Sequence, residues 1–152
     1  MKKLVVILGV IILIASTENN FAQQWSAEQL EVWKAVELTW DLGEKNDADG
    51  FLSNFDESYL GWSYHYDFPA DFERLNKSNR YFFNNNTVLL SMVSPSKIWV
   101  KDDFAFVHYY YTLTYKDLEN NVAQESGRWT DILMKKGNRW LVIGDHGGKT
   151  SK

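Results

Sequence analysis

Residues 125–148 read ESGRWTDILMKKGNRWLVIGDHGG, and this stretch decides the fold. Two hydrophobic segments flank the pair Gly137-Asn138, which is typical of a two-residue β-hairpin turn. The pair predicts an antiparallel hairpin of residues 125–136 and 139–147, in which Lys136 lies opposite Arg139.

The predicted register sorts the side chains of the hairpin onto two faces, because paired residues share a face and successive residues alternate. One face is expected to carry Trp129, Asp131, Leu133, Trp140, Val142 and His146. The other is expected to carry Arg128, Thr130, Ile132, Met134, Leu141, Ile143 and Asp145. Asp145 and His146 therefore point to opposite sides, and they cannot act as a dyad unless a bulge intervenes.

Two groups of candidate site residues follow from this sorting. His146 is expected near Asp131, whose carboxylate would fix the imidazole tautomer and favour a general base near neutral pH. Asp145 is expected beside Thr130 and near Arg128, a group suited to anchoring the polar or anionic head of a ligand. A structural salt bridge between Arg128 and Asp145, with no ligand at all, is an equally weighted alternative.

The segments before the hairpin predict two more strands. Residues 104–115 form a long strand, with His108 and Tyr110 on one face and Tyr109 and Tyr111 on the other; the pattern leaves open which face is concave. Residues 88–100 contain Ser94-Pro95-Ser96 in mid-run, which indicates a bent edge strand, because proline cannot donate a ladder hydrogen bond.

Helices are predicted in the N-terminal half. Ser26 and Gln29 form a capping box at the start of a helix over residues 27–46, with Gly43 as its natural end. A short second helix is expected after a turn, capped by Asp47 or Asp49.

A strand over residues 58–66 and a third helix over residues 68–83, with Pro69 in its first turn, complete the pattern. The order of elements predicts an α+β fold, with a strongly curved antiparallel sheet packed on N-terminal helices.

Composition limits the class of protein. The chain has 152 residues and a net charge of -4, which suits one domain. Basic residues are dispersed, so nucleic acid is not an expected partner. Aromatic residues make up 16% of the chain, which favours a dense core or an aromatic-lined cavity. There is no cysteine, and the three histidines lack metal-ligand spacing, so neither a disulfide nor a metal is expected.

The N-terminus has the order of charges and apolar residues found in a secretory signal. Lys2 and Lys3 precede an apolar run over residues 4–15 that is too short for an ordinary membrane span. Cleavage after Ala22 is expected, with cleavage near Ser16 or an uncleaved anchor as alternatives. The chain is thus divided into a signal peptide, 1–22, and one exported domain, 23–152, without a membrane segment after cleavage.

The whole mature chain resembles the nuclear transport factor 2-like superfamily, especially its SnoaL-like branch and the association domain of calcium/calmodulin-dependent protein kinase II. The resemblance is carried by Arg128-x-Thr130, the basic hairpin, Trp140, His146, the turn at 46–50 and the acidic pair Asp56-Glu57. The family commonly ends on His-x-Ser, whereas this chain has His146-Gly147-Gly148.

The resemblance implies a cone-shaped fold with a pocket closed by the first helix, and a homodimer formed through the outer sheet face. It does not imply one reaction, because enzymes and pure binding domains share this fold. In the isomerase pattern an oxyanion-binding tyrosine lies on the first helix, and the predicted first helix here contains none.

The predicted function is binding of a small, partly apolar molecule in an aromatic-lined pocket. The alternatives are an isomerase, cyclase or dehydratase with acid–base chemistry, and a non-catalytic dimerisation module. The candidate catalytic residues are His146 and Asp131, and no cofactor is expected. The candidate ligand-binding residues are Arg128, Thr130, Asp145, Trp129, His108, Tyr110, Trp40 and Tyr59.

Overall fold

The structure is a computed structural model that describes residues 24–150, so the predicted signal peptide and its cleavage site lie outside the described residues. None of the described helices is long and apolar enough to cross a membrane. The elements are α1 (Ala27–Glu44), α2 (Ala48–Leu52), β1 (Leu60–Ser63), β2 (Ala70–Asp71), α3 (Phe72–Asn85), β3 (Asn86–Lys101), β4 (Phe104–Asp117), β5 (Val122–Lys136) and β6 (Arg139–Lys149).

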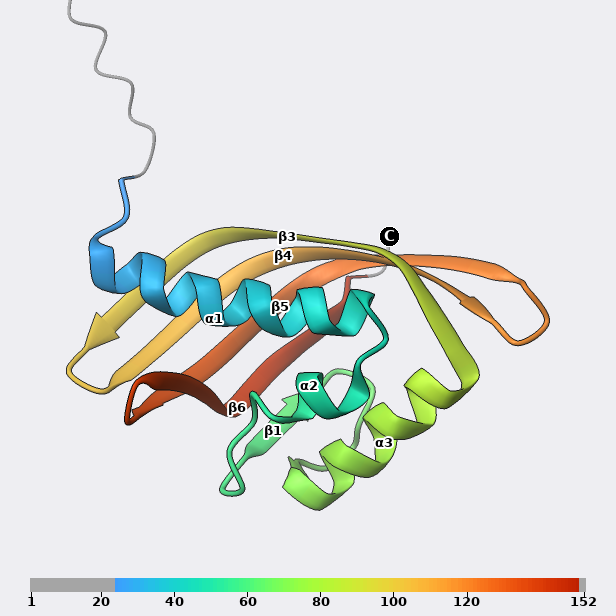
Figure 1. Cartoon of the computed structure of the whole chain (residues 1–152), viewed down its shortest axis with the longest axis horizontal. Coiled ribbons are helices and arrows are strands. Elements are labelled where there is room, and N and C mark those ends of the chain that lie inside the picture. The colour runs from blue at the N-terminus through green and yellow to red at the C-terminus, as the bar shows by residue number, and fades with distance from the viewer. Residues whose placement is uncertain (1–23, 151–152) are drawn as a thin grey trace, which may run out of the picture.

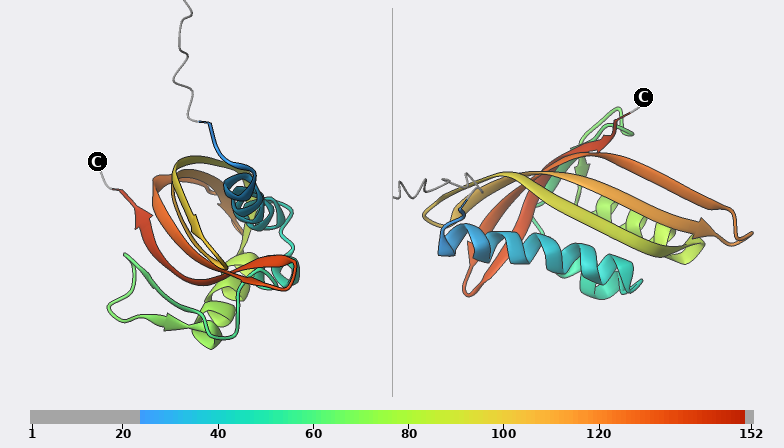
Figure 2. Two further views of the ribbon diagram at one scale, coloured as in Figure 1. Left: turned by 90° about the vertical axis from the view of Figure 1, so that its left-hand side faces the viewer. Right: turned by 90° about the horizontal axis from the view of Figure 1, so that it is seen from above.

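The strands form one sheet in the order β2-β1-β6-β5-β4-β3. The long strands β3 to β6 are antiparallel, as predicted, but β1 pairs in parallel with β6, so the sheet is mixed. Figure 1 shows α1 lying along one face of the long strands, and Figure 2 shows that the sheet curves around this side without closing. The predicted α+β fold is confirmed.

The first helix begins where the capping box predicts. The Ser26 hydroxyl accepts a hydrogen bond from the Gln29 backbone N–H, and the Gln29 side chain accepts one from the Ser26 N–H. The predicted end at Gly43 is wrong by one residue, because α1 continues through Glu44 and the chain turns at Asn46, which has φ 56°. Asp47 then caps α2 by accepting a hydrogen bond from the Gly50 N–H.

Two segments are shorter or later than predicted. The strand expected over residues 58–66 is reduced to Leu60–Ser63. The third helix starts at Phe72, because the Asp71 side chain caps it by accepting from the Arg74 N–H at 2.9 Å. Pro69 therefore precedes the helix, since residues 70–71 are used as β2, which pairs with β1.

The C-terminal hairpin forms as predicted at its turn, where Lys136 pairs with Arg139 and Gly137 has φ 64°. The bend at Ser94-Pro95-Ser96 is also confirmed, because β3 is an edge strand whose register shifts between Pro95 and Lys97.

A bulge in β6 changes the register beyond the middle of the hairpin. Leu133 pairs with Val142, but Ile132 pairs with Gly144, so that Ile143 has no partner. On the other edge of β6, residues 54–56 hydrogen-bond the backbone of Val142, whereas β1 pairs further along, at His146 and Gly147. The bulge lies between these two contacts.

The bulge reverses the predicted faces of Asp145 and His146. Asp145 lies opposite Asp131, and His146 lies opposite Thr130. The two residues do point to opposite sides, as expected, but each is on the side predicted for the other. The single inserted residue is the reason, because a shift of one position moves every later side chain to the other face.

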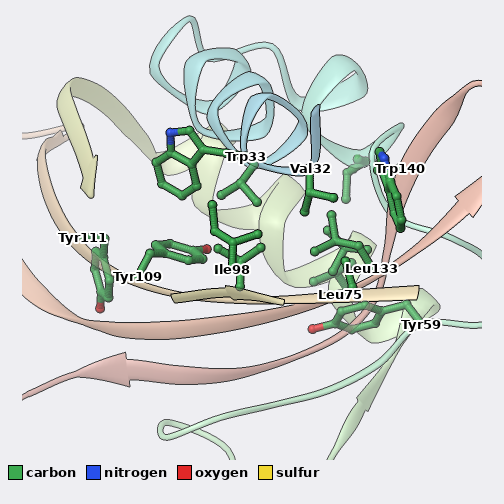
Figure 3. Close-up of a cluster of buried hydrophobic side chains, with 14 residues drawn as sticks. Val32, Trp33, Tyr59, Leu75, Ile98, Tyr109, Tyr111, Leu133 and Trp140 are labelled. Carbon is green, nitrogen blue, oxygen red and sulfur yellow. The ribbon is translucent and has the colours of Figure 1, made fainter. Parts of the chain in front are cut away.

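The hydrophobic core lies between α1 and the concave face of the sheet (Figure 3). Its most completely buried side chains are Val32, Val36, Ile98, Val107 and Leu133. The sequence left open which face of β4 is concave. Because Val107 and Tyr109 face this core, the odd-numbered residues of β4 from 105 to 111 point to the concave side.

We expect Leu133→Ala to lower the free energy of unfolding by about 3 kcal/mol, because it removes buried methyl groups and leaves a cavity. Leu133 is 1% exposed, whereas the next residue, Met134, is 36% exposed on the opposite face. Met134→Ala is therefore the matched control, with an expected loss below about 1 kcal/mol. Urea denaturation of both variants measures the difference, and equal losses would contradict the assignment of faces.

Candidate functional site

A cavity of about 300 Å³ lies beside the core, between the concave side of the sheet and the helices. All three helices and the strands β1 to β6 contribute side chains to its walls. Ten of the lining residues are aromatic: Trp40, Phe51, Phe55, Tyr59, Tyr66, Phe82, Phe83, Tyr109, Tyr111 and Trp129. Such a mostly apolar, concave space with a few polar groups is typical of a small-molecule site.

The most unusual polar feature of the cavity is a pair of buried carboxyl groups. Asp131 of β5 and Asp145 of β6 are cross-strand neighbours, so their Cβ atoms are about 5 Å apart. Both line the cavity, and they are only 6% and 9% exposed. Neither takes part in an ion pair within the described residues 24–150.

A hydrogen-bond chain holds Asp131. Trp40 Nε1 donates to the Tyr109 hydroxyl at 3.1 Å, and that hydroxyl donates to Asp131 Oδ2, also at 3.1 Å. An indole N–H can only donate, so the tyrosine must accept from Trp40 and use its own proton for Asp131. The chain thus fixes a tyrosine hydroxyl and a carboxyl group at the wall of the cavity.

Asp145 has a less complete set of partners. Its Oδ1 atom is buried and has no hydrogen-bond partner among the described residues. A Cβ atom at Gly61 would overlap both the Tyr59 hydroxyl and Asp145 Oδ1, so these two groups lie directly over the glycine. Only glycine at position 61 lets β1 approach the acid this closely.

The electrostatics of the pair favour protonation. Burial raises the pKa of Asp131 well above its usual value, the neighbouring Asp145 raises it further, and the hydrogen bond from Tyr109 opposes the rise. Burial raises the pKa of Asp145 from 3.8 to about 6, while the nearby Tyr59 hydroxyl and Trp129 indole limit the shift. Burial and the acids also raise the pKa of Tyr59 and Tyr109, which keeps both phenols neutral.

Two further acids line the cavity away from the pair. Glu44 accepts hydrogen bonds from the Ser91 backbone N–H at 2.7 Å and from the Ser91 hydroxyl at 2.8 Å. Tyr111 donates to Glu125 at 3.4 Å. The lining contains no lysine, arginine or histidine.

The structure divides the ten predicted site residues between the two faces of the sheet. The cavity holds Asp131, Asp145, Trp129, Trp40 and Tyr59. The other five, His146, Arg128, Thr130, His108 and Tyr110, share the opposite, outer face.

The predicted pairing of His146 with Asp131 is wrong, as is the grouping of Asp145 with Arg128 and Thr130. Because of the bulge at Ile143, each acid is separated by the sheet from the residues expected beside it. The alternative of a structural Arg128–Asp145 salt bridge is also wrong, for the same reason.

The outer-face residues make contacts of their own. His108 Nδ1 lies 2.7 Å from the Thr130 hydroxyl. His146 Nδ1 lies 2.8 Å from the Trp62 carbonyl oxygen, so Nδ1 carries the proton and donates. The His146 ring also packs edge-on against Tyr64. These contacts place both histidines away from the cavity.

Tyr109 and Glu125 are cavity residues that the sequence did not single out. The face of Tyr109 was known from strand alternation, but its contact with Trp40 depends on the packing of α1. The bulge did have a signal in the sequence, since a glycine inside a strand, here Gly144, often accompanies one. Among residues 24–150, no group of three or more histidine or acidic side chains is arranged to hold a metal ion.

No model of a protein family matches the sequence, and no curated protein matches it. Solved structures do match the fold. A ketosteroid isomerase-like protein from Erwinia carotovora atroseptica aligns with a TM-score of 0.71 at 13% identity, over 84% of this chain and all of its own. An NTF2-like protein from Cytophaga hutchinsonii aligns with a TM-score of 0.69 at 10% identity, over 83% of this chain and all of its own.

A Xanthomonas campestris protein named as a calcium/calmodulin dependent protein kinase II association domain aligns with a TM-score of 0.62 at 16% identity, over 85% of this chain and 91% of its own. The chain thus has the fold of nuclear transport factor 2-like and ketosteroid isomerase-like proteins, and the resemblance seen in the sequence is confirmed at that level. Identities this low show the fold alone, so the SnoaL-like branch stays a prediction.

The buried acids give an expected pH dependence of stability. A folded-state pKa above the unfolded value means that ionisation favours unfolding, so the free energy of unfolding falls as pH rises from about 4 to above 6. For Asp145 alone the shift corresponds to about 3 kcal/mol. Asp145→Asn should flatten this part of the profile and raise stability near neutral pH, as measured by urea denaturation across the pH range.

Asp56 provides a contrast within the same protein. Lys136 and Ser58 hydrogen-bond its carboxylate and lower its pKa to about 2, so its contribution to stability is lost as pH falls from about 4 to 2. Asp56→Asn should therefore lower stability at and above about pH 4, remove the slope between pH 4 and 2, and leave the slope between pH 4 and 6 unchanged. An unchanged slope between pH 4 and 6 in Asp145→Asn would refute the assigned ionisation.

Proposed function

We propose that this protein binds one small, partly apolar molecule in the cavity, with a polar group of the ligand against Asp131 and Asp145. The observation that carries the proposal is the unpartnered Oδ1 of Asp145, buried at the wall of an aromatic-lined space. A buried acceptor without a partner costs free energy, and a ligand that donates to it removes that cost.

The walls support a ligand with an apolar body. Phe51, Phe55 and Phe83 form one aromatic group, with ring centroids 5.2 and 5.4 Å apart. Trp40 and Tyr111 stack at 5.4 Å elsewhere in the lining. Rigid aromatic rings offer a large contact area and lose little entropy when a ligand binds.

Acid–base catalysis is a second candidate function, supported by the pKa of about 6 for Asp145. A carboxylate whose pKa is raised toward neutrality is a better general base than an ordinary aspartate. In this candidate the catalytic group is Asp145, with the Tyr59 or Tyr109 hydroxyl as a hydrogen-bond donor, in place of the His146 and Asp131 pair expected from the sequence.

Export and homodimerisation are further parts of the proposal. Export is supported by the order of charged and apolar residues at the N-terminus. A homodimer through the outer face is supported by the exposed side chains of Trp99, Phe104 and Tyr110, because aromatic residues are enriched in protein interfaces.

The binding proposal is tested by calorimetric titration with benzyl alcohol, phenethyl alcohol, phenethylamine and phenylacetate. At least one is expected to bind with a stoichiometry of one. Ser78→Phe should abolish binding, because Ser78 lines the cavity and the new ring occupies it. Lys77→Phe, the neighbouring exposed position on α3, adds the same ring outside the cavity and should leave the affinity unchanged.

His108→Ala and Arg128→Ala distinguish the cavity from the outer face. Both residues lie on the outer face, so neither change should alter the affinity by more than about twofold. Binding that survives Ser78→Phe, or that disappears with Arg128→Ala, would place the site outside the cavity and refute the proposal.

The catalytic candidate predicts deuterium exchange next to the carbonyl group of phenylacetone in heavy water, followed by NMR. The wild-type protein should accelerate exchange, and Asp145→Asn should reduce the acceleration about a hundredfold, because it removes the base. Retained binding of phenylacetone by the variant excludes loss of the pocket as the cause. Equal exchange rates in the two proteins would leave binding as the only function proposed for the cavity.

A further inference from the structure

The ionisable side chains that line the cavity are acids and tyrosines, without a basic residue. Four carboxyl residues line it, Glu44, Glu125, Asp131 and Asp145, and no lysine, arginine or histidine does. The exposed Arg74 packs its guanidinium over the Tyr66 ring, 4.7 Å from the centroid, but is not part of the lining. The positive charge that would normally accompany buried acids is missing from the walls of the cavity.

The acids differ in how well the protein satisfies them. Ser91 donates twice to Glu44, Tyr111 donates to Glu125 and Tyr109 donates to Asp131. Asp145 Oδ1 alone is both fully shielded and without a partner. The Tyr59 hydroxyl and the Trp129 indole lie near Asp145, but neither makes a hydrogen bond to Oδ1. A ligand can supply this donor, and a positively charged donor would also favour the ionised form of the carboxyl pair.

The aromatic walls suit the same kind of ligand. The face of a tryptophan, tyrosine or phenylalanine ring carries partial negative charge and attracts a cation within about 6 Å of its centroid. Tyr59 and Trp129 lie beside Asp145, and the Tyr109 hydroxyl contacts Asp131, so three aromatic side chains lie close to the carboxyl pair. Figure 3 shows the Tyr59 and Tyr109 hydroxyl groups turned toward the middle of the buried cluster.

Other classes of ligand fit less well. An anion would be repelled by the ionised carboxylates of the lining and would find no basic side chain there. A neutral donor would satisfy Asp145 Oδ1 but leave the negative charge uncompensated. A metal ion needs several oxygen ligands close together, and no group of three acidic or histidine side chains among residues 24–150 provides them.

We propose that the ligand of the cavity is an organic cation, a protonated amine on a small apolar body, whose ammonium group binds between Asp145 and Asp131. This inference rests on the proposed binding function and specifies the charge of the ligand. The ammonium group donates to Asp145 Oδ1, and the apolar body lies against the aromatic walls.

The test compares three probes with nearly the same skeleton but different charge: phenethylamine, phenethyl alcohol and phenylacetate. In calorimetric titrations near neutral pH, the amine is expected to bind about tenfold more tightly than the alcohol, because a hydrogen bond between charged groups is stronger than one from a neutral donor. Phenylacetate should bind most weakly.

Asp145→Asn should remove the preference, with amine affinity reduced about tenfold and alcohol affinity changed by less than about threefold. Glu57→Gln removes one negative charge from an exposed position and is the matched control, expected to leave both affinities unchanged. Circular dichroism confirms that each variant is folded. If a variant fails to fold, the ratio of amine affinity to alcohol affinity in the wild-type protein still tests the proposed charge of the ligand.

The outcomes separate the two proposals. If the alcohol or phenylacetate binds as tightly as the amine, the inference about charge is overturned and the binding function stands. A preference for the amine that persists in Asp145→Asn also overturns it, because the ammonium group would then lie elsewhere. If none of the three probes binds, the binding function and the inference fail together.

Discussion

One unpaired residue in the last strand decides what the cavity contains. With Ile143 bulged out of the ladder, Asp145 points to the concave side and lies opposite Asp131. Without the bulge the concave position would be taken by His146, and the acid would lie on the outer face. The bulge lies between the contacts of β6 with residues 54–56 and with β1, so the loop and strand on this edge of the sheet maintain it.

Bringing two carboxyl groups together in an aromatic environment opposes folding. Burial and mutual repulsion disfavour their ionised forms, and no ion pair within the described residues relieves them. The extensive apolar core between α1 and the sheet compensates for this cost. Destabilising polar groups of this kind are typical of functional sites, because they are arranged for a ligand or a reaction and not for the stability of the empty fold.

The two faces of the sheet differ in charge as well as in shape. The concave side carries acids and phenols in an enclosed, aromatic space, whereas the outer side carries Arg128, His108 and His146 in contact with solvent. Arg128, the cation expected near Asp145, therefore lies on the opposite side of the sheet from this acid. This separation leaves the acidic cavity without a basic side chain of its own, which is why we propose a positively charged ligand for it.

The sequence by itself determined the features that depend on residues close together along the chain. The capping box at Ser26, the Gly137-Asn138 turn, the bend at Pro95 and the α+β class are local signals, and each is confirmed. Strand alternation also showed correctly that Asp145 and His146 point to opposite sides. Half of the predicted site residues line the cavity; of those on strands, only Trp129, Asp131 and Asp145 do, because the bulge moved the last of these to the concave side.

Only the tertiary structure decided which of these side chains meet. The bulge at Ile143 lies next to contacts with residues 54–56, a segment almost ninety residues earlier in the sequence. The series of hydrogen bonds from Trp40 through Tyr109 to Asp131 depends on the packing of α1 against the sheet. The parallel pairing of β1 with β6 is likewise a long-range contact. Periodicity specifies the alternation of faces along a strand, but the absolute face is fixed by what packs against it.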